Sequence, residues 1–379
     1  MRILHVIHTL NRATGGPPEG LRQIALGYTK IGVTIEVLCL DNPEAPFVRD
    51  AGFIVHPLGD ISSAFAYSPK MLPWLRENIH RFDGIVVHGI WQWTNVAVRL
   101  AAKGKKPFGV FTHGAMDPWF KRNYPLKHLK KVLYWPLQYD VFRNAVAVFF
   151  TTDTEAELAR ESFWPNRWNS VVVPYGTNQP DGDPKAQKEA FLSAFPELRE
   201  RRYFLFLARI HEKKGCDLLL QAFASIASRY PDIDLVIAGP DQVGLQAKLM
   251  AAAVSRRIQQ RVHWPGLLQG DTKWGAFYGA EAFILPSHQE NFGIVVAEAL
   301  ACGLPVLISN QVNIWKDIVA DRTGFVEDDT AEGTLRLMEK WLSISEQEQR
   351  DMAERCLPSF LRRYSMKEAA KALARIFSS

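Results

Sequence analysis

Cysteine is scarce in this sequence, with four in 379 residues. The four stand far apart and form no Cys-x-x-Cys pair: Cys39, Cys216, Cys302 and Cys356. This spacing excludes a disulfide-stabilised scaffold and a paired-cysteine zinc site. It is typical of a protein that stays in a reducing compartment.

Long apolar runs are also missing. No stretch approaches the roughly 18 consecutive apolar residues of a membrane-spanning helix. The first residues, Met1–Ile7, fit a β-strand and lack the apolar run and small-residue cleavage site of a signal peptide. We therefore expect a cytoplasmic protein.

Several nucleotide-binding and metal-binding motifs are absent. The first strand is followed by neither Gly-x-Gly-x-x-Gly nor a Gly-x-x-x-x-Gly-Lys-Ser/Thr loop, and the chain has no His-Glu-x-x-His sequence or EF-hand loop. Two Asp-x-Asp patterns occur, Asp181–Asp183 and Asp232–Asp234. The first lies in a proline-rich segment and the second precedes its strand, where a metal–nucleotide site should follow one. No metal site is predicted.

The chain has only a small excess of positive over negative charge. The net charge is +5, with 47% apolar and 22% charged residues, the balance of an ordinary globular protein. Residues 1–175 carry 20 Lys and Arg against 14 Asp and Glu, whereas residues 176–379 carry 25 against 26. The first half therefore either meets an anionic partner or presents a basic solvated face. The excess is too small to favour nucleic acid.

What the sequence does contain is a regular alternation of short apolar runs with helical patterns. The runs, read as strands, are Ile3–Ile7, Ile35–Leu40, Phe53–His56, Gly84–His88, Phe108–Thr112, Val146–Thr151, Val171–Val173, Tyr203–Leu207, Asp234–Ala238, Val262–Trp264, Ala282–Leu285, Val306–Ile308 and Gly324–Val326. A capping box of Thr152 and Glu155 is expected to start a helix over Asp153–Ser162. Uninterrupted apolar strands alternating with helices predict parallel sheets covered on both faces.

A change of composition divides the chain in two. Proline, glycine and small polar residues dominate Pro174–Pro184, which is typical of a linker. The strand count restarts after it. The predicted fold is α/β, with two tandem Rossmann-like doubly wound domains over 1–175 and 176–361 that face a cleft. Ligands of such sheets bind beyond the carboxyl ends of the strands.

The clearest chemical signal follows the run Ala282–Leu285. Here Glu290 and Glu298 stand eight residues apart, around a helix expected over Phe292–Ala301 and ended by Gly303. The amides of Asn291, Phe292, Gly293 and Ile294 at its N-terminus suit a diphosphate. At 1.5 Å per residue the two glutamates would stand about 12 Å apart, the span of a nucleotide-sugar. The alternative is that Glu298 is a surface glutamate, although its neighbours are apolar and a lone carboxylate among them is costly.

With these motifs the sequence resembles the retaining glycosyltransferases of the family-4 type, which have the GT-B fold. The resemblance covers nearly the whole chain, and the paired glutamates are its specific part. It implies that Arg209 and Lys214, which follow Tyr203–Leu207, grip the donor diphosphate, that Glu290 and His113 orient the sugar, and that Glu298 holds the ribose. It also implies that a final helix, within about 362–379, returns to the first domain. Fixed cations stabilise the negative charge that grows on the leaving nucleotide.

Three further segments carry weaker signals. Gly15 and Gly16 permit a close backbone approach to phosphate or acceptor, or form a plain tight turn. His113 either donates to a sugar hydroxyl, or supports developing charge if protonated, or caps its strand. Trp91 and Trp93 either stack on an acceptor sugar or belong to the core.

The segment 119–135 holds five Lys or Arg, no acid and interleaved aromatic residues. It is interpreted either as a segment that contacts an anionic membrane or as a helix whose lysines lay their aliphatic stems on the apolar surface and keep their charged ends in water.

The expected function is metal-independent, retaining transfer of a hexose from a nucleotide-diphosphate sugar, with a UDP-sugar favoured over a GDP-sugar. The acceptor would be a glycan or a lipid-linked molecule in bacterial cell-surface polysaccharide synthesis, at the inner face of the plasma membrane. The alternatives are a nucleotide-sugar epimerase or hydrolase of the same fold and a non-catalytic nucleotide-sugar-binding protein.

Overall fold

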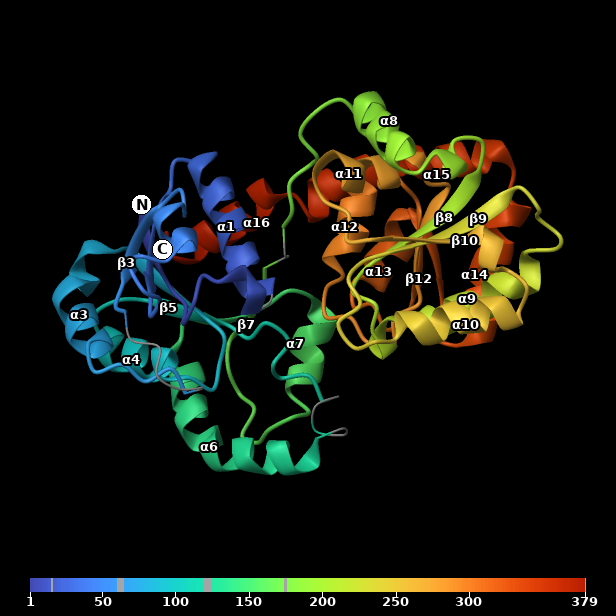
Figure 1. Ribbon diagram of the computed structural model, residues 1–379. Helices are drawn as coiled ribbons and strands as arrows, with labels where there is room; N and C mark the ends of the chain where they lie inside the picture. The colour runs from blue at the N-terminus through green and yellow to red at the C-terminus, as the bar shows by residue number, and fades with distance from the viewer. Residues whose placement is uncertain (15, 60–64, 119–120, 122–123, 174–175, 379) are drawn as a thin grey trace. The chain divides into compact units, whose positions relative to one another are not determined.

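The computed structural model describes residues 1–379 except 15, 60–64, 119–120, 122–123, 174–175 and 379. The chain divides into two compact units (Figure 1). The first comprises Met1–Gly176 together with Met366–Ser379, and the second comprises Thr177–Ser365. Gly15, which was predicted either to approach phosphate or acceptor closely or to form a plain tight turn, lies outside the described residues.

A parallel seven-stranded sheet forms the centre of the first unit, in the order β3-β2-β1-β4-β5-β6-β7. Its strands are β1 (Arg2–Val6), β2 (Thr34–Cys39), β3 (Ile54–Pro57), β4 (Gly84–His88), β5 (Phe108–Phe111), β6 (Ala147–Phe150) and β7 (Ser170–Val172). The apolar runs without alternation arise because both faces of this sheet are covered.

Helices cover the two faces of that sheet in separate layers. The described helices are α1 (Gly16–Thr29), α2 (Pro46–Arg49), α3 (Met71–Asn78), α4 (Trp93–Ala102), α6 (Pro125–Asn144), α7 (Asp153–Ala159) and α16 (Met366–Ile376). Side chains of β1 such as Ile3 join a core with α1 and α16, whereas Leu4 joins a core with α3, α4 and α6. The C-terminal helix α16 lies beside α1, so the chain ends against its own first helix (Figure 1).

The second unit is built around a six-stranded parallel sheet in the order β10-β9-β8-β11-β12-β13. Its strands are β8 (Arg202–Leu207), β9 (Ile233–Ala238), β10 (Val262–Gly266), β11 (Ala282–Leu285), β12 (Val306–Ser309) and β13 (Gly324–Glu327). Its helices are α8 (Pro184–Ala194), α9 (Cys216–Ile226), α10 (Gln246–Ser255), α11 (Gly270–Gly279), α12 (Ile294–Ala301), α13 (Trp315–Asp321), α14 (Ala331–Ser343) and α15 (Glu346–Arg363). Helix α9 packs on α14, α11 on α8, and α12 on α15.

The predicted α/β fold of two doubly wound units is confirmed, and each predicted strand is present within one or two residues. Helix α12 begins at Ile294, two residues later than predicted, because Gly293 before it has a left-handed backbone with φ of +77°. Thr152 caps α7 as expected, but the carboxylate of Glu155 does not complete a capping box. It accepts a hydrogen bond from the amide of Thr151 instead.

Candidate functional site

The sheet order of the second unit brings two of the predicted segments to one place. Strands β8 and β11 are parallel neighbours, so the loops after them leave the same edge of the sheet. The first loop carries Arg209 and Lys214, and the second carries Glu290. Sequence alone placed each residue after a strand but did not show that these strands are adjacent.

Lys214 is held in place by a close approach of the two loops. It ends a 3₁₀ turn, Glu212–Lys214, followed by Gly215 in the left-handed region with φ of +67°. A side chain at position 215 would overlap the carbonyl oxygen of Pro286, so only glycine lets the loops come this close. The amide of His288 then donates to the carbonyl oxygen of Lys213 at 2.8 Å. The ammonium of Lys214 consequently contacts the Glu290 carboxylate.

The surroundings of Lys214 favour its neutral form more than water does. Burial lowers the pKa of Lys214 to about 8, and the positive charges of Arg209 and Lys213 act in the same direction. The contact with Glu290 opposes this shift. An additional anion at this position would relieve the repulsion among the three cations.

Glu290 lies on an extended segment and not on a helix. Its amide donates to the carbonyl oxygen of Gln311 at 3.0 Å, and its own carbonyl accepts from the amide of Asn313 at 3.1 Å. Only the residues from Ile294 onward are helical, so the rise of 1.5 Å per residue does not apply between Glu290 and Ile294, and the spacing of about 12 Å stays a prediction.

The N-terminus of α12 has the backbone expected of an anion site. Gly293 is its N-cap and supplies no capping side chain, and the first amides of a helix, here including Ile294, have no intrahelical acceptor. Phe292 is buried and its ring packs edge-on against Tyr364, with centroids 5.6 Å apart. Phe292 and its neighbour Asn291 lie in the turn just before the helix, so Phe292 can serve a ligand through its backbone only.

Glu298 is buried on α12 and pairs with a lysine that the sequence analysis did not identify. Lys273 on α11 places its Nζ 2.8 Å from Glu298 Oε1 and 4.5 Å from the centre of the Trp274 ring. This ion pair removes the objection that a buried carboxylate would lack a partner, and the interpretation of Glu298 as a surface residue is wrong. No sequence spacing links positions 273 and 298, which meet only through the packing of the sheet.

Arg209 lies at the surface beside Lys214. Its Nη1 donates to Gln242 Oε1 at 3.2 Å, a contact across the loop after β9 that was not predicted. The guanidinium is therefore oriented by a neutral partner and keeps its full charge for an anion.

His113 belongs to the first unit and has a strained backbone. Its φ is +49° and that of Gly114 is +75°, which makes a tight turn just after β5. The buried Glu155 carboxylate fixes this turn, since it accepts from the Gly114 amide and the Thr112 hydroxyl at 2.8 Å each and from Thr151. Strain at a non-glycine residue is often kept for function. Burial lowers the pKa of His113 to about 4, so a neutral donor or acceptor is favoured over the protonated form.

The other predicted positions take less specialised environments. Gly16 begins α1, and a Cβ at this position would contact nothing, so glycine is not required there for packing. Trp91 and Trp93 pack against the core formed with α3, α4 and α6, which favours the core interpretation.

Aspartates of the two Asp-x-Asp patterns have structural partners. Asp183 caps α8, and Asp234 forms ion pairs with Arg201 and Arg261 and contacts His263. The described part of the chain holds no group of three or more His, Cys, Asp or Glu arranged for a metal ion.

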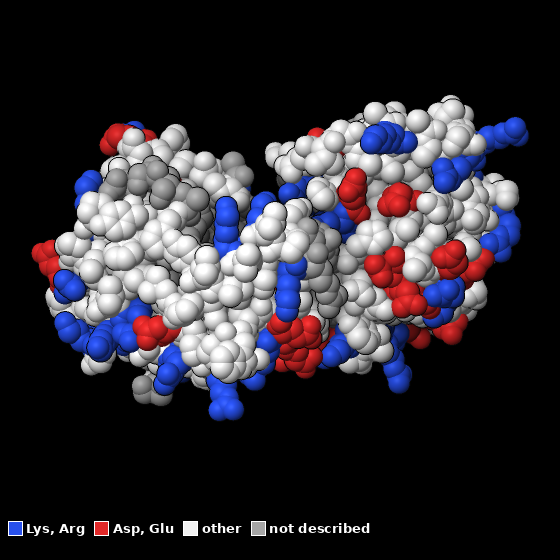
Figure 2. Space-filling view, turned by 90° about the horizontal axis from the view of Figure 1, so that it is seen from below, with Lys and Arg blue, Asp and Glu red and all other residues white. Residues whose placement is uncertain are grey.

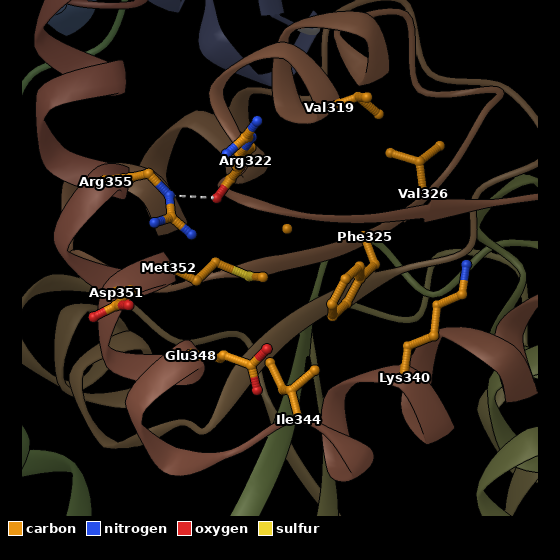
Figure 3. Close-up of a pocket in the computed structure, with 11 residues that line it drawn as sticks. Val319, Arg322, Phe325, Val326, Lys340, Ile344, Glu348, Asp351, Met352 and Arg355 are labelled. Carbon is orange, nitrogen blue, oxygen red and sulfur yellow. Dashed lines mark hydrogen bonds between the residues drawn. The ribbon is translucent and has the colours of Figure 1, made fainter.

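A separate pocket of about 460 Å³ opens over the edge strand β13, between α13, α14 and α15 (Figure 3). Phe325 and Met352 lie in the middle of the lining, with Arg355, Asp351 and Glu348 of α15 along one side and Lys340 of α14 on the other. None of the predicted site residues lines it. Its lining carries both acidic and basic side chains, so it does not select an anionic ligand.

Comparison with known proteins agrees with the geometry. Residues 187–356 match the family described as glycosyl transferases group 1, and residues 15–176 match the glycosyl transferase 4-like domain. A D-inositol 3-phosphate glycosyltransferase of Arthrobacter sp. (strain FB24) is 33% identical over 132 residues, 33% of this chain and 30% of that protein. A mannosylfructose-phosphate synthase of Agrobacterium fabrum is 22% identical over 348 residues, 83% of this chain and 75% of that protein.

Among solved structures, that of the Anabaena protein HepE with UDP and glucose has a TM-score of 0.76 at 17% identity, and covers 100% of this chain and 99% of that one. The likeness extends over both units and shows the GT-B fold. Because one family model or the other matches most of the sequence, from residue 15 to residue 356, the chain belongs to the group 1 glycosyltransferases of the family-4 type.

Proposed function

We propose that this protein transfers a hexose from a nucleotide-diphosphate sugar, with UDP-sugar as the favoured donor, to a glycan or a lipid-linked acceptor. The observation that carries the proposal is the pairing of Lys214 with Glu290, beside Arg209 and next to the N-terminus of α12. Such an arrangement offers cations and amides to a diphosphate and a carboxylate to sugar hydroxyls.

The chemistry follows from how charge develops during transfer. Cleavage of the sugar–phosphate bond leaves negative charge on the nucleoside diphosphate, which Arg209 and Lys214 stabilise without a metal ion. Glu290 is then released to accept from the sugar, while Glu298 accepts from the ribose diol. We assign no side chain as nucleophile or general base. We propose retention at the anomeric carbon, with a donor phosphate oxygen taking the acceptor proton.

The known relatives give more support for the assignment of the donor than for any assignment of the acceptor. The HepE structure is described with UDP and glucose, which favours a uridine donor over GDP-mannose. The relatives named above act on an inositol phosphate and a sugar phosphate by their names, so they agree on no acceptor. The first of them is matched over only 30% of its length, and we place this chain in cell-surface polysaccharide synthesis as part of the proposal.

Thermal unfolding with a panel of nucleotides tests the donor assignment. UDP, UDP-glucose, GDP and GDP-mannose are each added with and without EDTA. A ligand at 100 times its Kd stabilises the native state by about 2.7 kcal/mol, which raises the melting temperature measurably. We expect UDP and UDP-glucose to do so in EDTA. Lys214→Ala should lose both effects, whereas Glu290→Ala should lose only the additional stabilisation that UDP-glucose gives over UDP. Stabilisation by none of the four, or only with metal, would contradict the proposal.

Product analysis separates transfer from the two alternatives. A hydrolase or epimerase consumes UDP-glucose at full rate without an acceptor, and a binding protein does not consume it at all. A transferase releases UDP slowly in water and faster with an acceptor extract. Equal rates with and without acceptors would favour the hydrolase.

We also propose that the first unit contacts an anionic membrane through the exposed half of α6. Leu126, Leu129, Leu133 and Leu137 form a stripe at helical spacing, with exposed fractions of 78%, 61%, 79% and 43%. The stripe lies opposite the buried side of the helix, which contains Trp135. Apolar side chains flanked by lysines are the pattern of a helix that lies in a membrane interface.

Charge near α6 agrees with this role. Lys127 and Lys130 beside the stripe are exposed, whereas Lys131 turns inward over the Trp91 ring. The surface of the first unit on the face seen in Figure 2 is mostly uncharged, with more basic than acidic side chains. Among the described residues, none of the helices is long and apolar enough to cross a membrane. Residues 119–120 and 122–123 of the predicted segment lie outside the description.

A further inference from the structure

Three histidines of the first unit form a continuous hydrogen-bonded chain. His5 Nδ1 lies 2.8 Å from His88 Nε2, and His88 Nδ1 lies 3.1 Å from His113 Nε2. They come from the neighbouring strands β1 and β4 and from the turn after β5, on the face that α1 and α16 cover. His5 and His88 are fully buried. Buried polar side chains in an otherwise apolar layer require a reason beyond packing.

The two hydrogen bonds must have the same donor-to-acceptor direction because each imidazole ring is neutral. Burial lowers the pKa of His5 to about 3 and that of His113 to about 4, and it lowers that of His88 well below its ordinary value. A neutral imidazole has one N–H and one lone pair. If His88 donates to His113, it must therefore accept from His5, and if it accepts from His113, it must donate to His5. The two hydrogen bonds run the same way.

The buried end of the chain decides which way. His5 Nε2 is buried and has no hydrogen-bond partner among the described residues. The ring of Tyr28 meets His5 edge-on, with centroids 5.6 Å apart, and the buried Tyr28 hydroxyl likewise has no hydrogen-bond partner among the described residues. If the bonds ran toward His5, Nε2 would carry a proton with no acceptor, and orphaned buried N–H groups are rarer than unsatisfied acceptors. The favoured direction is from His5 to His113.

We propose that His88, itself oriented by His5, is a positioning residue that fixes His113 as the tautomer with its proton on Nδ1. His113 Nε2 is engaged by His88, so Nδ1–H is the group that the ring offers to a substrate oxygen. The strained turn and its anchor on Glu155 hold the ring stacked on His88, with centroids 5.3 Å apart. His113 then acts as a fixed donor to a sugar hydroxyl and not as a base. This inference rests on the proposed function only for the identity of the substrate.

Nitrogen-15 NMR of histidine-labelled protein measures the tautomer directly. The His113 signals are assigned by comparison with His113→Ala. We expect wild-type His113 to show a protonated Nδ1 and a bare Nε2. In His88→Phe, which keeps a flat ring but removes both hydrogen bonds, we expect the two tautomers to mix. The exposed His80→Gln variant is the control and should leave the His113 signals unchanged.

Kinetics then tests whether the tautomer matters. With UDP-glucose as substrate and UDP release as the readout, His88→Phe should lower kcat about tenfold with little change in KM for the donor, and His80→Gln should match wild type. A wild-type His113 protonated on Nε2 would overturn the inference without needing any variant. Unchanged His113 signals, or an unchanged kcat, in His88→Phe would also overturn it. Full activity of His113→Ala would instead contradict the site assignment, while the tautomer measurement would still stand.

Discussion

At the scale of single residues, the proposed contact of Lys214 with the donor diphosphate predicts that donor binding depends on pH. Its pKa of about 8 means that the ammonium is charged below pH 8 and increasingly neutral above it. Because a diphosphate binds the charged form, we expect the Kd for UDP to rise with pH above 8, toward tenfold per unit. Lys214→Ala should raise the Kd at pH 7 by about 10- to 100-fold, the value of a charged hydrogen bond.

Calorimetric titration with UDP from pH 6.5 to 9.5 measures this dependence. Lys214→Arg is the matched variant, because a guanidinium stays protonated throughout that range. It should bind UDP with little dependence on pH. A wild-type curve that is flat to pH 9.5 would show that Lys214 does not contact the diphosphate.

The pair of Glu298 and Lys273 concerns stability as well as binding. Glu298→Gln and Lys273→Met each leave a partly buried charge without its partner, and each should cost about 2 kcal/mol. The double variant should lose less than the sum, by about 1 kcal/mol or more, because the two groups interact directly. Urea denaturation of the four proteins measures this coupling, and strict additivity would show that the ion pair contributes nothing.

At the scale of elements, Gly293 sets the start of α12 and the position of Glu290. A Cβ at position 293 would lie 3.0 Å from Val312 Cγ1 and 3.3 Å from Glu290 Cγ, in a backbone that already disfavours a side chain. We expect Gly293→Ala to cost about 2 kcal/mol or more and, by displacing Glu290, to weaken UDP-glucose binding about tenfold.

Gly303, at the other end of the same helix, provides the control. Its φ of +73° is almost the same, but a Cβ there would contact nothing within 4 Å. Gly303→Ala should therefore cost about 1–2 kcal/mol from strain alone and leave UDP-glucose binding intact. Equal effects of the two variants on UDP-glucose affinity would show that backbone strain, and not displacement of Glu290, is responsible.

The turn that presents His113 depends on α7 through Glu155. Glutamine at this position keeps one acceptor oxygen but points an amide N–H₂ at groups that are themselves donors. We expect Glu155→Gln to cost about 3 kcal/mol in thermal unfolding, from two lost charge-assisted hydrogen bonds. Glu157→Gln, on the exposed side of the same helix, should change stability by less than about 0.5 kcal/mol. A similar small change in Glu155→Gln would contradict the anchoring role.

These elements also show what the sequence can and cannot predict. Strands such as β11 were predicted from their apolar runs, since burial on both faces leaves a local signature. The delayed start of α12 was not, because a glycine before a helix is compatible with several backbone conformations. Glu155 was assigned a local capping role, but its carboxylate also accepts hydrogen bonds from Thr112 and Gly114 in the turn after β5, about 40 residues earlier in the chain. Lys273 was missed for the same reason, since its partner is set by tertiary packing.

At the scale of the whole molecule, the basic excess of residues 1–175 and the leucine stripe on α6 occur in the same unit. Binding to vesicles tests whether they act together. Replacing Leu126, Leu129 and Leu133 with serine should lower affinity for anionic vesicles at least tenfold, because burying even part of a leucine contributes about 1 kcal/mol. Lys127→Gln with Lys130→Gln should lower it by about 1 kcal/mol per charge, and only on anionic vesicles at low salt.

The control is Leu361→Ser, which removes an exposed leucine, with 46% of its surface accessible, from α15 in the second unit. Flotation with vesicles of phosphatidylcholine alone, or mixed with phosphatidylglycerol, separates the two contributions, since the leucines act on both and the lysines on the second only. If the wild type floats with neither, the stripe does not bind lipid. Self-association that the same serine substitutions abolish would then assign it to contact with a second copy of the chain, because an apolar stripe of this exposure is otherwise costly in water.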